Sequence, residues 1–256
     1  MSEPAGWTVD YGNWVSSRLV LVPTVLAVLF GATALLLLPV LGVLAAFFFL
    51  CALYFAYARY MFSPRGGSIQ TKVQYLVLDH LAGWEGVGKV LDIGCGNAPL
   101  TIEIAKAHPE AEVVGVDYWS SGWEYSVGVC ERNAEVEGVG GRVAFERASA
   151  VSLPYADEAF DVVVSNLVFH NIRVVKDNRE LVREALRVLK KGGRFVLQDL
   201  FLWKRVYGDT DELLAAIKSW GVETVAFVDA SRSDFIPTVL KLPFMLGTVG
   251  IIHGRK

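Results

Sequence analysis

The segment Val90–Leu100, VLDIGCGNAPL, constrains this chain more than any other. An apolar run closes on two glycines and continues into a helical pattern, which predicts a strand, a glycine turn and a helix. Gly94 and Gly96 permit a positive φ and a close approach of backbone to ligand, and the N-terminus of the following helix offers free N–H groups. The sequence therefore predicts a site for a nucleotide-type cofactor in an α/β fold.

Residues around this turn indicate which cofactor the site would bind. A dinucleotide fingerprint requires a third glycine three residues after Gly96, where this chain has Pro99. Asp92 places a carboxylate two residues before the first glycine, where it repels a pyrophosphate and attracts the ammonium of an amino-acid group. A second acid, Asp117, ends the apolar run Glu112–Asp117, 21 residues after Gly96, at about the offset where a carboxylate meets ribose hydroxyls. We therefore expect S-adenosylmethionine (SAM) and not NAD.

Four motifs in this order resemble the class I SAM-dependent methyltransferases, and the resemblance covers residues 68–256. The motifs are VLDIGCG at 90–96, VVGVD at 113–117, LPYADEAFDVVVSNLVFHNI at 153–172 and EALRVLKKGGRFVLQDL at 184–200. The resemblance implies a doubly wound, Rossmann-like sheet of seven strands. It also implies that the last strand, near 246–253, is an antiparallel insertion and that this part of the chain transfers methyl groups from SAM.

The resemblance also implies cofactor contacts residue by residue. The methionine end of SAM falls to the glycine turn, and the ribose falls to Asp117. The family usually carries Gly-Asp-Ala at the adenine position, where this chain has Ala148-Ser149-Ala150, so Ser149 would accept the adenine hydrogen bond without a charge. The candidate cofactor residues are Asp92, Gly94, Cys95, Gly96, Asp117, Tyr118, Ser149, Ala150 and Asn166.

His170 is the candidate catalytic residue, because it lies in SNLVFHNI just past the fourth strand, at the rim where substrate meets the transferable methyl group. Its imidazole titrates near neutrality and could serve as general base for a hydroxyl or amine acceptor. The alternative is that His170 shapes the pocket or bonds a backbone carbonyl, since proximity and orientation can carry much of methyl transfer. Aromatic residues that could line an acceptor pocket are Tyr118, Trp119, Trp123, Phe201 and Trp203.

The first 62 residues differ in composition from the rest. No charged side chain occurs from Leu19 to Ala58, a run of 40 residues. One helix of that length would extend about 60 Å, twice the hydrocarbon thickness of a bilayer. We therefore expect two transmembrane spans at about 19–38 and 41–59, with the turn at Pro39–Gly42. A re-entrant hairpin that does not fully cross is the alternative, because this turn is wholly apolar.

Two spans return the chain to one face of the membrane. Arg18, Arg59 and Arg65 flank the apolar run, and positively charged residues favour the cytoplasmic side. We therefore expect an integral membrane anchor at 1–62 and a cytoplasmic methyltransferase domain at 63–256. Because every candidate cofactor residue follows residue 62, this division predicts that removal of residues 1–62 leaves SAM affinity nearly unchanged.

The expected acceptor follows from this location: a lipid or another hydrophobic small molecule dissolved in the bilayer. The apolar segment 235–244 would be a pocket lid or a membrane-contacting patch. The alternatives are a protein or soluble metabolite as acceptor, a catalytically inactive SAM-binding protein, and an NAD-dependent oxidoreductase.

Composition excludes other classes of partner. The net charge of −3 argues against a nucleic-acid substrate, which would require a basic face. The three cysteines show no metal-ligand spacing and no disulfide framework, so we expect no metal site. Nothing in the sequence predicts the oligomeric state.

Overall fold

The computed structural model describes residues 8–119 and 125–256, and the chain divides into two compact units. One unit combines the described residues up to Tyr11 with Gln74–Lys256, and the other comprises Gly12–Val73. The packing boundaries between the two units therefore lie before residues 12 and 74. The division into an anchor at 1–62 and a methyltransferase domain at 63–256 stays a prediction. Trp123, one of the predicted pocket aromatics, lies outside the described residues.

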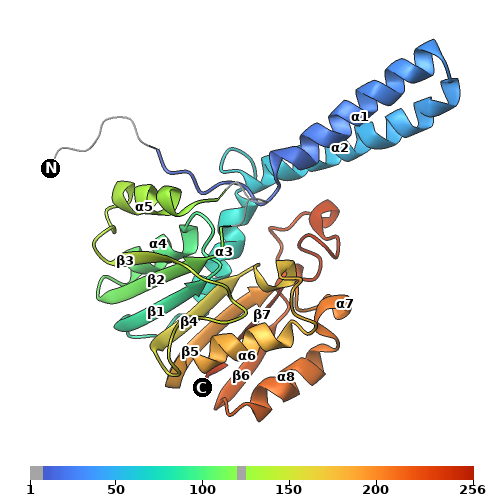
Figure 1. Ribbon diagram of the computed structural model, residues 1–256. Coiled ribbons are helices and arrows are strands. Elements are labelled where there is room, and N and C mark those ends of the chain that lie inside the picture. The colour runs from blue at the N-terminus through green and yellow to red at the C-terminus, as the bar shows by residue number, and fades with distance from the viewer. Residues whose placement is uncertain (1–7, 120–124) are drawn as a thin grey trace. The chain divides into compact units, whose positions relative to one another are not determined.

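A seven-stranded sheet forms the centre of the larger unit (Figure 1). The strands are β1 (Gly88–Ile93), β2 (Ala111–Asp117), β3 (Val143–Arg147), β4 (Phe160–Asn166), β5 (Leu189–Asp199), β6 (Thr224–Val228) and β7 (Gly250–Arg255). Their order across the sheet is β3-β2-β1-β4-β5-β7-β6, and β7 runs antiparallel to both of its neighbours. The predicted doubly wound, seven-stranded fold is confirmed, with its antiparallel strand beginning at Gly250 and not near residue 246.

Helices cover both faces of this sheet (Figure 1). The strand order reverses direction between β1 and β4, so right-handed crossovers place the helices after β1 and β2 on one face and those after β4 and β5 on the other. The first face carries α4 (Pro99–Ala107) and α5 (Val127–Val136), and the second carries α6 (Arg179–Arg187) and α8 (Thr210–Ser219). The connections hold α7 (Lys204–Tyr207) and the 3-10 helices η2 (Phe169–Asn171), η3 (Ala230–Arg232) and η4 (Thr238–Leu240), and α3 (Ile69–Asp79) precedes β1.

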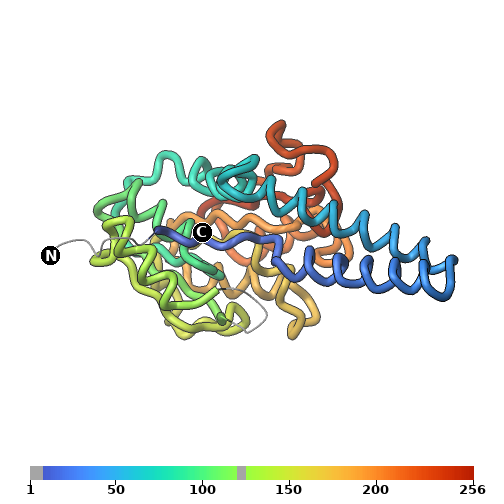
Figure 2. Tube along the Cα trace, turned by 90° about the horizontal axis from the view of Figure 1, so that it is seen from above, coloured from blue at the N-terminus to red at the C-terminus, as the bar shows by residue number. Residues whose placement is uncertain are grey.

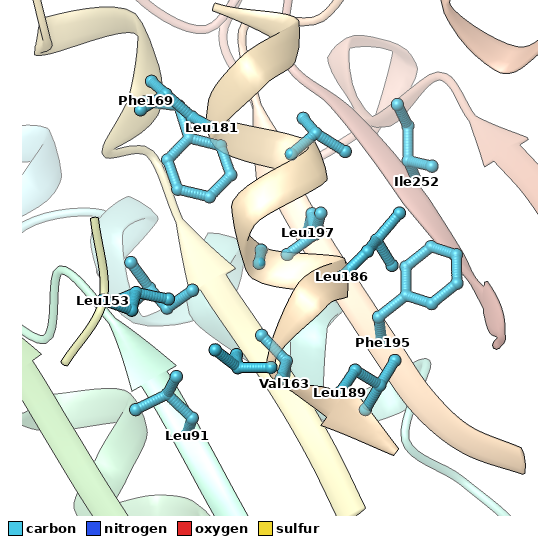
Figure 3. Close-up of a cluster of buried hydrophobic side chains, with 14 of the residues drawn as sticks. Leu91, Leu153, Val163, Phe169, Leu181, Leu186, Leu189, Phe195, Leu197 and Ile252 are labelled. Atoms are coloured by element: carbon cyan, nitrogen blue, oxygen red, sulfur yellow. The ribbon is translucent and has the colours of Figure 1, made fainter. Parts of the chain in front are cut away.

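The core between the sheet and α6 is apolar (Figure 3). Leu91 of β1 and Val163 of β4 are fully buried, as is Leu197 of β5, and the cluster includes Leu181 of α6 at 1% exposure. These strands are nearly continuous apolar runs because helices bury both of their faces. The core thereby fixes the carboxyl ends of β1, β2, β4 and β5 along one edge of the sheet, where the predicted site residues lie.

The smaller unit is a helical hairpin. Helices α1 (Ser17–Leu36) and α2 (Gly42–Phe62) run side by side, joined by the 3-10 helix η1 (Pro39–Leu41) (Figure 2). Helix α1 ends before Pro39, whose ring disfavours the helical conformation in the preceding residue. Both helices are long and apolar enough to cross a membrane by length and composition, and α1 buries none of its side chains within the structure.

Candidate active site

The glycine turn, Gly94–Ala98, connects β1 to α4 and is bonded to the end of β2. The N–H groups of Gly94 and Cys95 donate to Val116 O at 2.7 and 3.0 Å, and that of Gly96 donates to Asp117 Oδ2 at 3.0 Å. These amides already have partners inside the protein. What the turn offers a ligand is therefore accessible backbone without side chains, and not the free N–H groups of these three residues.

The two glycines are required for different reasons. Gly94 has a φ of 76°, and a Cβ there would overlap the side chain of Val168, which follows β4. Gly96 has a φ of 60°, and a Cβ there would make ordinary contact with the Tyr125 ring at 3.6 Å. Ala98 also adopts the left-handed region, with a φ of 67°, which costs a non-glycine residue roughly 1–2 kcal/mol. Sequence analysis did not single out Ala98.

Asp92 lies beneath the turn and is 1% exposed. Its Oδ2 accepts a hydrogen bond from Thr101 Oγ1 of α4 at 2.6 Å, a partner that sequence analysis missed. Burial raises the pKa of Asp92 to about 7; the Thr101 hydrogen bond opposes this increase and the charge of Asp117 adds to it. The attraction of Asp92 for an ammonium group stays a prediction. It would act between charges in a medium of low dielectric.

Two buried cysteines and a strand glycine pack around the same turn. Cys95 lies within the turn, and Cys130 Sγ of α5 donates to Gly96 O at 3.1 Å. A Cβ at Gly115 of β2 would lie 3.0 Å from both Cys95 Sγ and Thr101 Oγ1. Gly115 therefore leaves room for the turn to pack against β2, so its role is one of packing.

Asp117 ends β2, where its half-buried carboxylate faces the turn. Besides Gly96 N–H, it accepts from Trp119 N–H through Oδ1 at 2.8 Å. Each oxygen keeps a lone pair for a further donor such as a ribose hydroxyl. The Trp119 indole N–H donates to Gly96 O at 2.9 Å, and Tyr118 is 58% exposed with the Arg147 guanidinium 5.0 Å from its ring centroid.

The loop after β3 and the end of β4 hold the other predicted cofactor residues. Ala148 N–H donates to Asp117 O at 3.0 Å, which ties the Ser149–Ala150 loop to the end of β2. Ser149 Oγ accepts from Val151 N–H at 3.3 Å within this loop. At the end of β4, Asn166 Oδ1 accepts from Gln198 Nε2 at 2.8 Å. The contacts of these residues with a cofactor stay predictions.

His170 and Asp199 form a hydrogen-bonded pair at the carboxyl ends of β4 and β5. His170 Nδ1 lies 2.7 Å from Asp199 Oδ1. Asp199 is 1% exposed and also accepts from the N–H groups of Phe169 (2.8 Å) and Leu200 (2.6 Å). Burial lowers the pKa of His170, but the charge and hydrogen bond of Asp199 together outweigh it, so the pKa is raised above the usual histidine value. With Nδ1–H donated to Asp199, Nε2 is the ring nitrogen available to a substrate proton.

Sequence analysis selected His170 and missed the residues that orient it. Asp199 is the last residue of β5, and its place at the carboxyl end of a predicted strand was the available indication. Burial, together with the charge of Asp199, raises the pKa of Tyr207 on α7. Phe201, predicted to line the pocket, is fully buried and packs against Tyr207 with 4.8 Å between ring centroids, so it belongs to the core.

Comparison with known proteins identifies the family. A family described as "Methyltransferase domain" matches residues 86–232, more than half of the chain. The chain belongs to this methyltransferase family. Membership of this family confirms two predictions from the sequence: the enzyme class, a methyltransferase, and the cofactor, SAM.

Two curated relatives share part of this domain. The chain is 38% identical over 127 residues to 27-O-demethylrifamycin SV methyltransferase of Amycolatopsis mediterranei, covering 48% of this chain and 44% of the relative. It is 34% identical over 130 residues to the ubiquinone/menaquinone biosynthesis C-methyltransferase UbiE of Geobacter sulfurreducens, covering 48% of each. The matched region thus spans less than half the length of these relatives.

Solved structures share the fold at lower identity. A geranyl diphosphate methyltransferase in complex with SAM aligns with a TM-score of 0.57 and 16% identity over 78% of this chain and 89% of its own. The [4+2]-cyclase SpnF aligns with a TM-score of 0.54 and 19% identity over 72% and 80%. One of these is named for methyl transfer and the other for cyclisation, so the shared fold does not decide the reaction, and function must be argued from the site.

Proposed function

We propose that this protein transfers a methyl group from SAM to a hydrophobic small molecule, such as a membrane lipid, at the cytoplasmic face of a membrane. The observation that carries the proposal is the His170–Asp199 pair, which lies at the same edge of the sheet as the glycine turn and Asp117. A proton acceptor and a cofactor turn at one edge suit the methylation of a hydroxyl or amine.

The residues at the turn fit SAM. Asp117 presents carboxylate lone pairs beside backbone that carries no side chain at Gly96, which suits a ribose diol. Asp92 adds negative charge beneath the turn, which suits the cationic amino-acid end and disfavours a pyrophosphate. When bound, SAM supplies an electrophilic methyl group on a sulfonium, and this chain would hold it through the turn, Asp117 and the Ser149 loop.

His170 is the proposed general base. Its Nε2 accepts the proton of an acceptor hydroxyl or amine, and the electron pair left on that oxygen or nitrogen becomes the nucleophile. Asp199 holds the tautomer in which Nδ1 carries hydrogen, and it stabilises the imidazolium that forms. The proton then leaves His170 for solvent as the product departs.

Asp199→Asn tests this role, because it keeps the size of the side chain and removes its charge. We expect turnover to fall about 100-fold, the scale of general-base catalysis, while SAM affinity stays within about twofold. Loss of the Asp199 charge also lowers the pKa of His170, so the acid limb of the pH–rate profile should move to lower pH. Asp177→Asn, at a half-buried carboxylate paired with Arg179, is the control. Wild-type turnover in Asp199→Asn would contradict the assignment.

The hairpin turn supports a membrane location. The N–H groups of Leu37 and Leu38 both donate to Thr33 O, and that of Leu41 donates to Leu38 O. The hydroxyls of Thr24 and Thr33 donate to helix carbonyls four residues earlier, each at 2.8 Å. Because the bilayer core provides no water for such groups, hydrogen bonds made within the segment are what lipid requires.

Charge supports the orientation and the acceptor class. Arg18 and Arg59 stand near the two ends of the hairpin that lie away from the turn, and the 40 residues between them carry no charge. Basic residues at these ends favour the cytoplasmic side, where SAM is available. Each helix rises about 30 Å, which matches the hydrocarbon thickness. A site tethered there meets acceptors dissolved in the bilayer at a raised effective concentration.

Methyl transfer into membrane lipids is the direct test. Full-length protein in nanodiscs is incubated with SAM labelled in its methyl group and with a native membrane extract, and lipids, proteins and aqueous metabolites are then separated. We expect label in the lipid fraction, and much less with His170→Ala. Label confined to the protein or aqueous fraction would contradict a lipid acceptor, and no transfer would favour an inactive SAM-binding protein.

A further inference from the structure

Two buried asparagines of the larger unit bind the main chain of Asp10. Asn133 of α5 pairs with it as a peptide group would: Asp10 N–H donates to Asn133 Oδ1 at 2.9 Å, and Asn133 Nδ2 donates to Asp10 O at 2.9 Å. Asn97, the residue after Gly96, donates its Nδ2 to the same carbonyl at 3.1 Å. Both asparagines are 1% exposed, so these hydrogen bonds satisfy amides that water does not reach.

The same two amides connect Asp10 to the predicted cofactor site. Asn133 Nδ2 also donates to Asn97 O at 3.0 Å, and Asn97 Oδ1 accepts from Ser126 N–H at 3.2 Å. Ser126 is the N-cap residue of α5, and the ring of Tyr125 before it lies next to Gly96. One network of hydrogen bonds therefore joins the N-terminal segment, the glycine turn and the start of α5.

A second contact fastens the N-terminal segment further along α5. The Tyr11 hydroxyl donates to Glu137 Oε1 at 3.2 Å, at the C-terminal end of this helix. Glu137 also accepts from Lys106 Nζ of α4 at 2.8 Å. The described residues 8–11, which Figure 2 draws in dark blue, are thus bound to α5 at two points about one turn apart, at Asn133 and at the C-cap residue Glu137.

We propose that residues 8–11 are a positioning segment for the cofactor site. By occupying Asn97 and Asn133, the segment holds the glycine turn and the N-terminus of α5 in the conformation that receives the cofactor; this inference rests on the proposed function. Without the segment, two buried side-chain amides lose their main-chain partners, which is costly at a site adjacent to the ligand. SAM affinity should therefore depend on residues that precede the hairpin, and removal of residues 1–62 should weaken it, contrary to the prediction from sequence.

The segment also links the hairpin to the cofactor site through the chain itself. Tyr11 is its last residue in the larger unit, and only Gly12–Ser16 separate it from the start of α1.

A pair of substitutions at Asp10 separates main-chain recognition from a side-chain effect. Asp10→Pro removes the N–H group that donates to Asn133 Oδ1, whereas Asp10→Ala keeps both the N–H and the C=O of residue 10. In full-length protein in nanodiscs, we expect titration with SAM to show at least tenfold weaker binding for Asp10→Pro and a change within about twofold for Asp10→Ala. Equal affinity of both variants and the wild type would overturn the proposal.

Hydrogen exchange without cofactor provides a readout that does not depend on the reaction. We expect faster exchange of the amides at 94–98 and 126–130 in Asp10→Pro than in Asp10→Ala, with the β4 and β5 amides unchanged. Asn133→Asp, which turns a donor into an oxygen facing two carbonyls, should give the same pattern if the fold persists. Unchanged exchange at the turn would overturn the inference. If the wild type fails to bind SAM, the proposed function is wrong, and exchange alone then decides on the segment.

Discussion

The hairpin turn, Leu37–Leu41, and the glycine turn, Gly94–Ala98, satisfy their amides in opposite ways. In the hairpin turn, N–H groups donate to carbonyls at most five residues away, and large side chains such as Leu37 are 75% exposed. In the glycine turn, the N–H groups of Gly94, Cys95 and Gly96 donate to Val116 and Asp117 on another strand, and that of Ala98 donates within the turn, to Cys95 O. A turn closed on itself suits lipid, whereas a turn held from outside can present bare backbone to a ligand.

A substitution at Gly94 tests this comparison with the largest expected effect. Gly94→Ala should lower the free energy of unfolding by about 2–5 kcal/mol, because it adds left-handed strain and an overlap with Val168. Gly192→Ala is the matched control, since Gly192 has the same φ of 76° and a Cβ there would meet no atom within 4 Å. It should cost only the strain, about 1–2 kcal/mol. Equal losses in denaturant titrations would show that Gly94 is not required for packing.

A charge introduced in the hairpin turn should weaken membrane insertion, whereas a charge at an exposed site of the larger unit should not. Val40→Lys places an ammonium at the tip of the hairpin. Because each helix matches the hydrocarbon thickness, the tip of two full spans lies near the far interface, so the loss of insertion free energy should stay below about 2.5–3.5 kcal/mol, the cost of a charge at the bilayer centre. Val174→Lys is the control, because Val174 is 83% exposed in the larger unit and Val40 is 72% exposed. The measurement is the fraction of protein kept by membranes after an alkaline wash. Equal retention of both variants would contradict a lipid-embedded turn.

Asp92 should give the glycine turn a pH dependence. Because its pKa in the folded protein is about 7, above the ordinary value of 3.8, the neutral carboxyl stabilises the fold most below about pH 4, and this contribution is lost as pH rises to about 7. The charge that attracts an ammonium group appears in the folded protein as pH rises through about 7. SAM affinity should therefore rise up to about tenfold per unit below pH 7 and level off above it. Asp92→Asn should remove this slope, and an unchanged slope would assign it to another group.

Local patterns predicted the elements that depend on neighbouring residues. Gly94 and Gly96 predicted the turn, and the uncharged run from Leu19 to Ala58 predicted a hairpin with its break at Pro39. In each case propensity and hydrophobicity act over a few residues, so the sequence carries the information directly. The antiparallel β7 came from the family resemblance, since no local pattern fixes strand order.

Contacts between distant residues could not be predicted in this way. Asn133 lies 123 residues from Asp10 and Asn97 lies 87 residues from it, and neither asparagine belongs to a motif that indicates the pairing. Asp199 was visible as an acid at the end of a strand, but its bond to His170 depends on the adjacency of β4 and β5. Such side chains acquire their roles only when the sheet brings them together.

Titration of the full-length protein with SAM, comparing wild type with Asp117→Ala, tests the central claim most directly. We expect the wild type to bind SAM and not NAD, and Asp117→Ala to bind SAM about 5- to 150-fold more weakly, which corresponds to roughly 1–3 kcal/mol for a lost acceptor of buried hydroxyls. Glu112→Ala on the same strand, at a side chain that is 72% exposed, should leave the affinity unchanged. Unchanged SAM affinity in folded Asp117→Ala would contradict the cofactor site described above.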